Sequence, residues 1–244
     1  MKNNIFSLNV NFKQEKLCND FYFSGIKISE NIFAFTSNSV DKNGEDKIIF
    51  FNIYNKKLIY EIKNYSFILS TNGLNLIKGE EIENNNNILL CACKKYIKGQ
   101  NNGILLINID KDNIFHIFYD TSNFEVFCFC QIAIIKKLNY FQNNYKYIYT
   151  KYFLVGGFNK DKKKGIIKLY KIIYNENIKN TTIEYIQDIE PKKNQKFKGF
   201  QYPISCIAQS QYNGNILISC WDGNIYLFTP PDIHYFLFYD KIFK

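Results

Sequence analysis

The sequence predicts an all-β fold, and its composition, its alternating apolar segments and a four-fold recurrence support this class. Among 244 residues there are 38 Ile, 23 Phe and 19 Tyr but only four Ala, and all 31 basic residues are Lys. Ile, Phe and Tyr favour strands, whereas helices are rich in Ala, Leu and Arg. Hydrophobic residues make up 46% of the chain, which is enough for a core and excludes global disorder.

A short pattern, a turn residue followed by an alternating apolar segment, recurs four times along the chain. Its copies begin at Asp46, Gly103, Gly165 and Gly223, at intervals of 57, 62 and 58 residues. A near-constant period in this range is typical of folds that stack one supersecondary unit several times. We therefore predict that each copy is one strand of a repeated β-unit.

Each repeated unit is predicted to contain four strands, of which the recurring pattern is the third. Period-2 apolar segments bounded by Gly, Asn, Asp and Lys indicate the other strands. The first strands are expected at 21–28, 67–77, 126–135 and 204–208, the second at 33–37, 89–93, 153–157 and 217–220, and the fourth at 58–62, 114–119, 183–189 and 235–239. The units then span 21–64, 65–122, 123–202 and 203–244, after an N-terminal extension over 1–20.

The last unit contains the most recognisable segment. Residues 215–228 read Asn-Ile-Leu-Ile-Ser-Cys-Trp-Asp-Gly-Asn-Ile-Tyr-Leu-Phe. This segment resembles the second and third blade strands of the WD-repeat family of β-propellers, joined by an Asp-Gly turn. The family's namesake Trp-Asp ends the third strand, whereas Trp221 and Asp222 precede Gly223 in the turn. We expect a structural role for them, and the alternative is that Trp221 is an exposed residue that binds a partner.

The resemblance implies a diverged β-propeller of about four four-stranded blades, as a closed, open or partial ring. An apolar segment over 5–12 precedes the first unit. Because the last unit already has a predicted fourth strand at 235–239, the segment 5–12 has no vacant place in a four-unit ring. We therefore expect an open or partly open arc that is prone to associate, since uncovered apolar edges and faces favour association.

Seven cysteines include two Cys-x-Cys pairs, Cys91/Cys93 and Cys128/Cys130. Residues i and i+2 of a strand share one face, and free Cys is among the most buried residue types. Core packing is therefore expected, and the spacing differs from the Cys-x2-Cys of common zinc sites. The odd count, the lack of a signal peptide and the lack of a membrane-spanning run favour an intracellular location, in the cytoplasm or nucleus.

No recognisable catalytic motif is present. Only two histidines occur, His116 and His234, each beside apolar residues of a predicted strand, and phosphate-binding and nucleophile-elbow motifs are missing. A binding module without enzymatic activity, metal or cofactor is therefore expected. The family resemblance implies a scaffold that presents its propeller loops to partner proteins.

Lysines are concentrated in the loops that a propeller would place on one of its ends. The charges of these loops sum to +7, whereas the loops of the opposite end, including a predicted loop over 136–151, sum to 0. Solubility alone explains such lysines, and the alternative is a docking surface for an acidic protein or for RNA. The absence of Arg weakens the RNA alternative. The residues are Lys94, Lys95, Lys98, Lys160, Lys162, Lys163, Lys164, Lys192, Lys193, Lys196 and Lys198.

Overall fold

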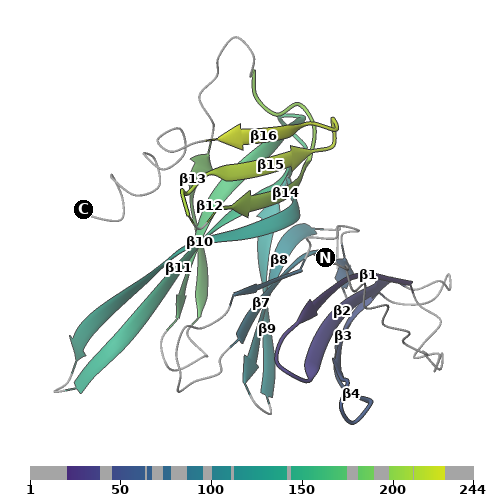
Figure 1. The fold of residues 1–244 in the computed structure, drawn as a ribbon, viewed down its shortest axis with the longest axis vertical. Coiled ribbons are helices and arrows are strands. Elements are labelled where there is room, and N and C mark those ends of the chain that lie inside the picture. Colours follow the sequence, from purple (N-terminus) through teal and green to yellow (C-terminus); the bar gives the residue numbers. More distant parts are fainter. Residues whose placement is uncertain are drawn as a thin grey trace, which may run out of the picture.

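The protein was analysed as a computed structural model that describes residues 21–38, 46–63, 65–67, 74–77, 87–95, 101–110, 113–141, 144–174, 181–189, 198–210 and 212–228. Within these residues the chain forms strands and no helix (Figure 1), so the prediction of an all-β fold is confirmed. No helix in the described part of the chain is long and apolar enough to cross a membrane.

The strands form four antiparallel sheets that follow one another along the chain. The first sheet contains β1 (Phe21–Lys27), β2 (Ile32–Asn38), β3 (Lys47–Asn52) and β4 (Lys57–Ile62). The second contains β5 (Tyr65–Phe67), β6 (Leu74–Ile77), β7 (Asn87–Lys95), β8 (Asn101–Asp110) and β9 (Asn113–Ser122). The third contains β10 (Phe124–Phe141), β11 (Asn144–Asn159), β12 (Lys164–Tyr174) and β13 (Thr182–Ile189). The fourth contains β14 (Ile204–Gln209), β15 (Ile216–Cys220) and β16 (Ile225–Phe228).

Each sheet is built from strands that are neighbours in sequence, and the alternating apolar residues explain where most of them lie. The first strand expected over 67–77 differs, because two separate strands, β5 and β6, pair with β7. The segments expected to form strands at 5–12 and 235–239 lie outside the described residues.

The prediction of a loop over 136–151 is wrong. β10 and β11 pair from Phe124 opposite Asn159 to Phe141 opposite Asn144, with two shifts of register, between Val126 and Cys128 and between Gln131 and Ala133. The Lys and Asn residues of this segment suggested a loop, but Leu, Ile, Tyr and Phe alternate with them and favour strands. Lys151, which was expected in that loop, is instead a buried residue of β11.

The core consists of three apolar layers, one between each pair of consecutive sheets. β7 shows how this works, because its side chains alternate between two layers. Leu89, Cys91 and Cys93 pack toward the first sheet, whereas Ile88 and Leu90 pack toward the third. The third sheet likewise packs on the fourth through its opposite face. The second and third sheets are therefore apolar on both faces, as expected for sheets covered on two sides.

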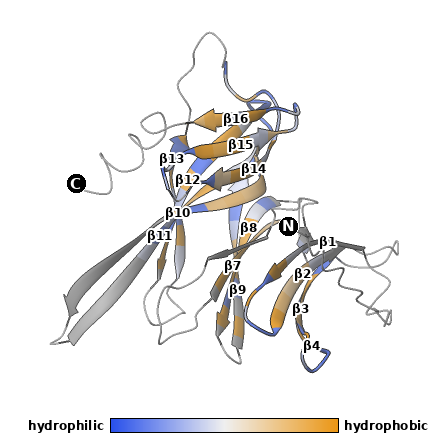
Figure 2. Cartoon of the chain, in the orientation of Figure 1, coloured by the Kyte–Doolittle hydropathy of each residue, from blue (hydrophilic) through white to orange (hydrophobic). Residues whose placement is uncertain are grey.

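The first and fourth sheets lie at opposite ends of this row (Figure 1), and neither belongs to a core layer that includes the other. Among the described residues, each of them packs one face on a neighbouring sheet, and no described sheet belongs to a core layer with the other face, which we call its outer face. Figure 2 shows that β15 and β16 of the fourth sheet are largely hydrophobic in colour. The row of four stacked sheets is the framework that holds the turns described next.

Candidate partner-binding surface

The turn between β11 and β12 contains three of the predicted lysines, Lys160, Lys162 and Lys163. The side-chain oxygen Oδ1 of Asn159 accepts a hydrogen bond of 2.8 Å from the backbone N–H of Lys162. The backbone N–H of Lys160 donates to the carbonyl of Asn123 at 2.9 Å. Lys163 has φ 49°, in the left-handed region, which closes the turn. These contacts fix the turn against the end of β9, so its lysines project from a defined backbone.

The turn between β15 and β16 contains Trp221, Asp222 and Gly223. The N–H of Gly223 donates to the carbonyl of Cys220 at 3.1 Å, and Gly223 has φ 81°, which glycine adopts without steric cost. The carboxylate of Asp222 accepts 2.9 Å and 2.6 Å hydrogen bonds from the Asn224 N–H and the Tyr226 hydroxyl. The carboxylate therefore supports the turn, while Trp221 faces outward.

The segment 198–203 joins these two turns. The N–H of Gly165, at the start of β12, donates to the carbonyl of Phe200 at 3.1 Å. The N–H of Trp221 donates to the carbonyl of Pro203 at 3.0 Å, and the Cys220 thiol lies 3.0 Å from the carbonyl of Tyr202. The three segments therefore form one end surface. We call it the Lys–Trp surface and define it by Lys160, Lys162, Lys163, Lys198, Tyr202 and Trp221.

Two aromatic side chains are the most exposed apolar groups of the Lys–Trp surface. Trp221 is 60% exposed and Tyr202 is 54% exposed. The indole of Trp221 packs edge-on against the buried ring of Phe127, with ring centroids 5.0 Å apart at an interplanar angle of 64°. One edge of the indole is thus held by the third sheet and the rest faces solvent. Anchored, exposed Trp residues are frequent among those that dominate binding energy at protein interfaces.

Carboxylates offset much of the positive charge of this surface. Lys160 lies 4.0 Å from Glu125, and Lys162 lies 3.7 Å from Asp188. Asp161, between them in sequence, accepts a hydrogen bond of 2.6 Å from Asn123. The ion pairs are partly exposed and each is worth little free energy, but together they lower the local positive potential.

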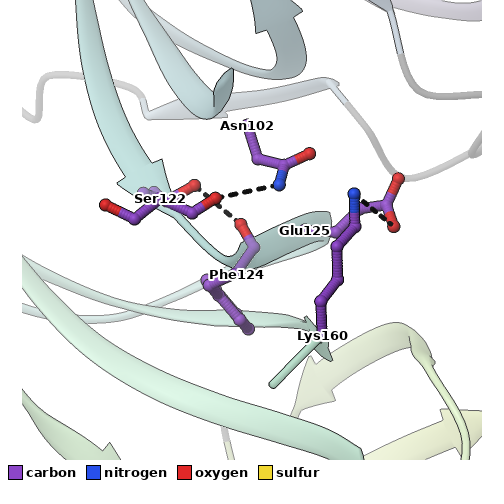
Figure 3. A network of polar contacts seen from close by, with 6 residues as sticks. Asn102, Ser122, Phe124, Glu125 and Lys160 are labelled. Atoms are coloured by element: carbon purple, nitrogen blue, oxygen red, sulfur yellow. Dashed lines mark hydrogen bonds and ion pairs between the residues drawn. The ribbon is translucent and has the colours of Figure 1, made fainter. Parts of the chain in front are cut away.

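Behind Lys160, a polar network fixes the connection between β9 and β10 (Figure 3). The amide nitrogen Nδ2 of Asn102 donates to the carbonyl of Ser122 at 2.9 Å, and the hydroxyl of Thr121 donates to the carbonyl of Phe124 at 2.7 Å. The ion pair of Lys160 and Glu125 completes the group. This network connects the second and third sheets beneath the Lys–Trp surface.

Burial shifts the pKa of two groups next to this surface. Lys168 of β12 is partly buried, with its ammonium 4.7 Å from the ring centroid of Phe124 and 5.1 Å from that of Tyr185. Burial lowers the pKa of Lys168, and the positive charge of Lys162 acts in the same direction, while Asp188 opposes them. Burial, together with the charge of Asp188, raises the pKa of Tyr185 to about 12.

The lysines that were predicted to lie in loops of one end lie partly in turns and partly in strands. Lys94 and Lys95 belong to β7 and Lys164 is the first residue of β12, so their expected loop positions are wrong. These lysines were misplaced because β7 continues past its last apolar residue, Cys93, and β12 begins before its first, Ile166. Lys198 is exposed beside Phe200. Lys98, Lys192, Lys193 and Lys196 lie outside the described residues.

Sequence reasoning did not identify Tyr202 or Phe127 as part of this surface. Tyr202 precedes Pro203 in a segment without period-2 alternation. The Tyr-Pro pair in a predicted loop was the one sequence feature that could have indicated an exposed aromatic residue there. Phe127 carries no such signal, because it is one of several aromatic residues in β10. Its contact with Trp221 joins two sheets and depends on the tertiary arrangement.

The Cys-x-Cys pairs lie in the core layers. Cys91 and Cys93 pack between the first two sheets, and Cys128 and Cys130 pack between the last two. Burial raises the pKa of all four thiols, with that of Cys130 raised to about 11. Among the described residues, no three His, Cys, Asp or Glu side chains form a group that could hold a metal ion.

Comparisons with known proteins add no relative. No protein-family profile, no curated protein and no solved structure matches this chain.

Proposed function

We propose that this protein is a non-catalytic interaction scaffold, built as a diverged WD-repeat-like β-propeller, that binds partner proteins through its Lys–Trp surface. The observation that carries the proposal is Trp221, which is 60% exposed although its edge is held against Phe127. Such a side chain loses little conformational freedom on binding and adds a large apolar area to an interface. The succession of four antiparallel sheets, with three to five described strands each, and the stacking of consecutive sheets support the propeller part of the proposal.

The proposed partner is a protein with a mixed surface. Trp221 and Tyr202 would enter an apolar depression of the partner, and Lys163 and Lys198 would face its acidic residues. Complementary charges at the rim of an interface mainly raise the association rate and make it dependent on salt.

Trp221→Ala tests the proposal, with Tyr212→Ala as its matched control. Tyr212 is fully exposed in the turn between β14 and β15. Tyr212→Ala therefore removes an aromatic side chain at another position of the same sheet. We expect proteins that copurify with the wild type from cell extract to remain with Tyr212→Ala and to be lost with Trp221→Ala. Equal retention by both variants, at equal unfolding midpoints, would contradict the proposal.

RNA binding by the lysines is the alternative, and the ion pairs of Lys160 and Lys162 with carboxylates make it the weaker one. Filter binding over a salt series separates the two. RNA retention that falls steeply with salt, and that is lost when Lys162 and Lys163 are changed to Glu, would favour the alternative.

A further inference from the structure

Four asparagines of the chain are followed directly by glycine, and this pair of residues can react with itself. The backbone nitrogen of the glycine attacks the side-chain amide carbon of the asparagine. Glycine favours this step, because it has no Cβ to obstruct the approach and adopts many backbone conformations. The pairs are Asn43-Gly44, Asn72-Gly73, Asn102-Gly103 and Asn213-Gly214, of which the first two lie outside the described residues.

The pair Asn102-Gly103 is held in a conformation that prevents this reaction. Asn102 is 3% exposed, and its amide nitrogen Nδ2 donates to the carbonyl of Ser122 at 2.9 Å (Figure 3). Gly103 is an interior residue of β8, where it lies opposite Cys93 of β7 and Asp120 of β9. The side chain and the backbone are therefore both fixed by neighbouring strands, and they can approach each other only if β8 opens.

The pair Asn213-Gly214 lies in the turn between β14 and β15, where the surroundings are open. Asn213 is exposed. Its side-chain oxygen Oδ1 accepts a hydrogen bond of 3.1 Å from the backbone N–H of Asn215, two residues further on. This Asx turn folds the side-chain amide forward over the peptide group that joins Asn213 to Gly214. The two groups that react are thus directed toward each other.

The backbone of Gly214 adds little resistance. Gly214 has φ 70°, in the left-handed region, and its N–H donates to the carbonyl of Ser210 at 3.0 Å. This bond belongs to the turn and not to a strand ladder. Hydrogen bonds of exposed turns open locally at a small part of the free energy needed to unfold the whole protein. The Gly214 nitrogen therefore becomes available in the folded protein.

We infer that Asn213 is a site of spontaneous deamidation. A bond forms between the Gly214 nitrogen and the Asn213 carbon Cγ while the bond from Cγ to Nδ2 breaks, and Nδ2 leaves as ammonia with the proton of the Gly214 N–H. Water then opens the five-membered succinimide at either carbonyl. Opening at one carbonyl gives aspartate, and opening at the other gives isoaspartate, whose backbone contains one additional methylene group. Water is the only co-reactant.

Either product places a carboxylate in the β14–β15 turn, next to the fully exposed side chain of Tyr212. The inference is independent of the proposed function, because Asn213 precedes β15 and Trp221 follows it. Deamidation therefore changes the end of the fourth sheet that lies away from the Lys–Trp surface.

Ageing of the purified full chain at 37 °C tests the inference, with one sample folded and one unfolded in urea. Peptide mass spectrometry against a sample taken at time zero locates each site at which an amide has become a carboxylate. In urea both Asn102 and Asn213 should convert. In the folded protein Asn213 should still convert, whereas Asn102 should convert at least about a hundred times more slowly than in urea, because β8 must open first. Conversion of Asn213 should be faster at pH 8 than at pH 6, since the attacking nitrogen must lose its proton.

Two substitutions and a matched control confine the reaction to this pair. Asn213→Gln should abolish conversion at position 213, because its longer side chain would have to close a six-membered ring. Gly214→Ala should slow conversion several-fold, because of the added Cβ and its strain at a positive φ. Asn215→Gln, which changes the next amide but keeps the backbone N–H, should leave the rate at Asn213 unchanged.

An unchanged Asn213 in the folded protein, over a time in which the chain in urea converts, would overturn the inference. So would equal rates at Asn102 and Asn213 in the folded protein, because the turn would then give no advantage. A conversion rate at Asn213 that Gly214→Ala does not reduce, or that is the same at pH 6 and pH 8, would overturn the route through the Gly214 nitrogen.

Discussion

Asp222 holds the β15–β16 turn with both of its carboxylate oxygens, one bound by the Asn224 N–H and the other by the Tyr226 hydroxyl. Burial would raise the pKa of Asp222, but the hydrogen bonds from Tyr226 and Asn224 outweigh it and lower this pKa below the ordinary 3.8. A carboxyl with a depressed pKa in the folded state stabilises the fold above its unfolded pKa. That contribution is lost as pH falls through the folded pKa.

Asp222→Ala should therefore lower the free energy of unfolding at pH 7 by about 0.5–1 kcal/mol, an amount reduced by the solvent exposure of the turn. As the pH falls below the ordinary pKa of 3.8, the difference from the wild type should shrink, because the unfolded state binds a proton first and the folded carboxyl binds one only at its lower pKa. Urea unfolding monitored by the fluorescence of Trp221, the single tryptophan, measures both values. Tyr226→Phe, which removes one of the two bonds, should show a smaller loss. An equal difference at pH 7 and pH 3 would contradict this account.

The buried thiols lead to a second prediction about single residues. A thiolate is the reactive form of cysteine, so a raised pKa and burial both slow alkylation. Cys91, Cys93 and Cys128 are essentially inaccessible, whereas Cys206 is only partly buried. Native labelling with iodoacetamide at pH 8, followed by peptide mass spectrometry, should modify Cys206 first and the other three only after unfolding in urea. If Cys128 were alkylated as fast as Cys206 in the native protein, this prediction would be wrong.

Within β11, two adjacent glycines allow two different kinds of close packing. A Cβ at Gly157 would meet the backbone carbonyl of Glu125 in the paired strand β10, which cannot move without breaking the ladder. A Cβ at Gly156 would meet the Cys128 sulfur at 2.6 Å and a methyl of Ile204 at 2.7 Å, and these side-chain ends can adjust.

Gly157→Ala should lower the free energy of unfolding by about 1–3 kcal/mol, as over-packed substitutions do, and Gly156→Ala should cost less. Chemical denaturation of both variants and the wild type shows which substitution lowers the free energy of unfolding more. Because both variants add one methyl to the same strand, differences in strand propensity cancel. A larger loss for Gly156→Ala would show that the layer between the third and fourth sheets is the more rigid of the two surroundings.

The strands themselves could be predicted well, because period-2 alternation is local information. All four strands of the first sheet lie within a few residues of the expected ranges. The failures have a common cause, since polar residues inside strands were taken for loops. Lys94 and Lys95 continue β7, and residues 136–141 and 144–150 continue the β10–β11 pair. Strand length there depends on pairing with a partner strand, which no single segment reveals.

On the scale of the whole molecule, sequence reasoning identified repetition but not the contacts between repeats. It placed the lysines of several loops on one end. In the structure, Gly165 at the start of β12 and Trp221 both hydrogen-bond to the segment 198–203. Sequence reasoning did not identify the carboxylates of Glu125 and Asp188, which come from β10 and β13 and neutralise two of those lysines. Sequence reasoning also could not tell which of the two apolar faces of a strand packs against a neighbouring sheet. The outer faces of the first and fourth sheets could be identified only from the strand register and the core layers in the structure.

The pairing of consecutive strands also bears on how the chain reaches its native state. Except for the pairing of β5 with β7, the described strands pair with their neighbours in sequence. The entropy lost on forming these hairpins is therefore that of a short connection. Topologies dominated by nearby contacts fold faster than those that must first bring distant segments together. During synthesis the first sheet can form while the second is still being translated. Each completed sheet then offers an apolar face on which the next one packs.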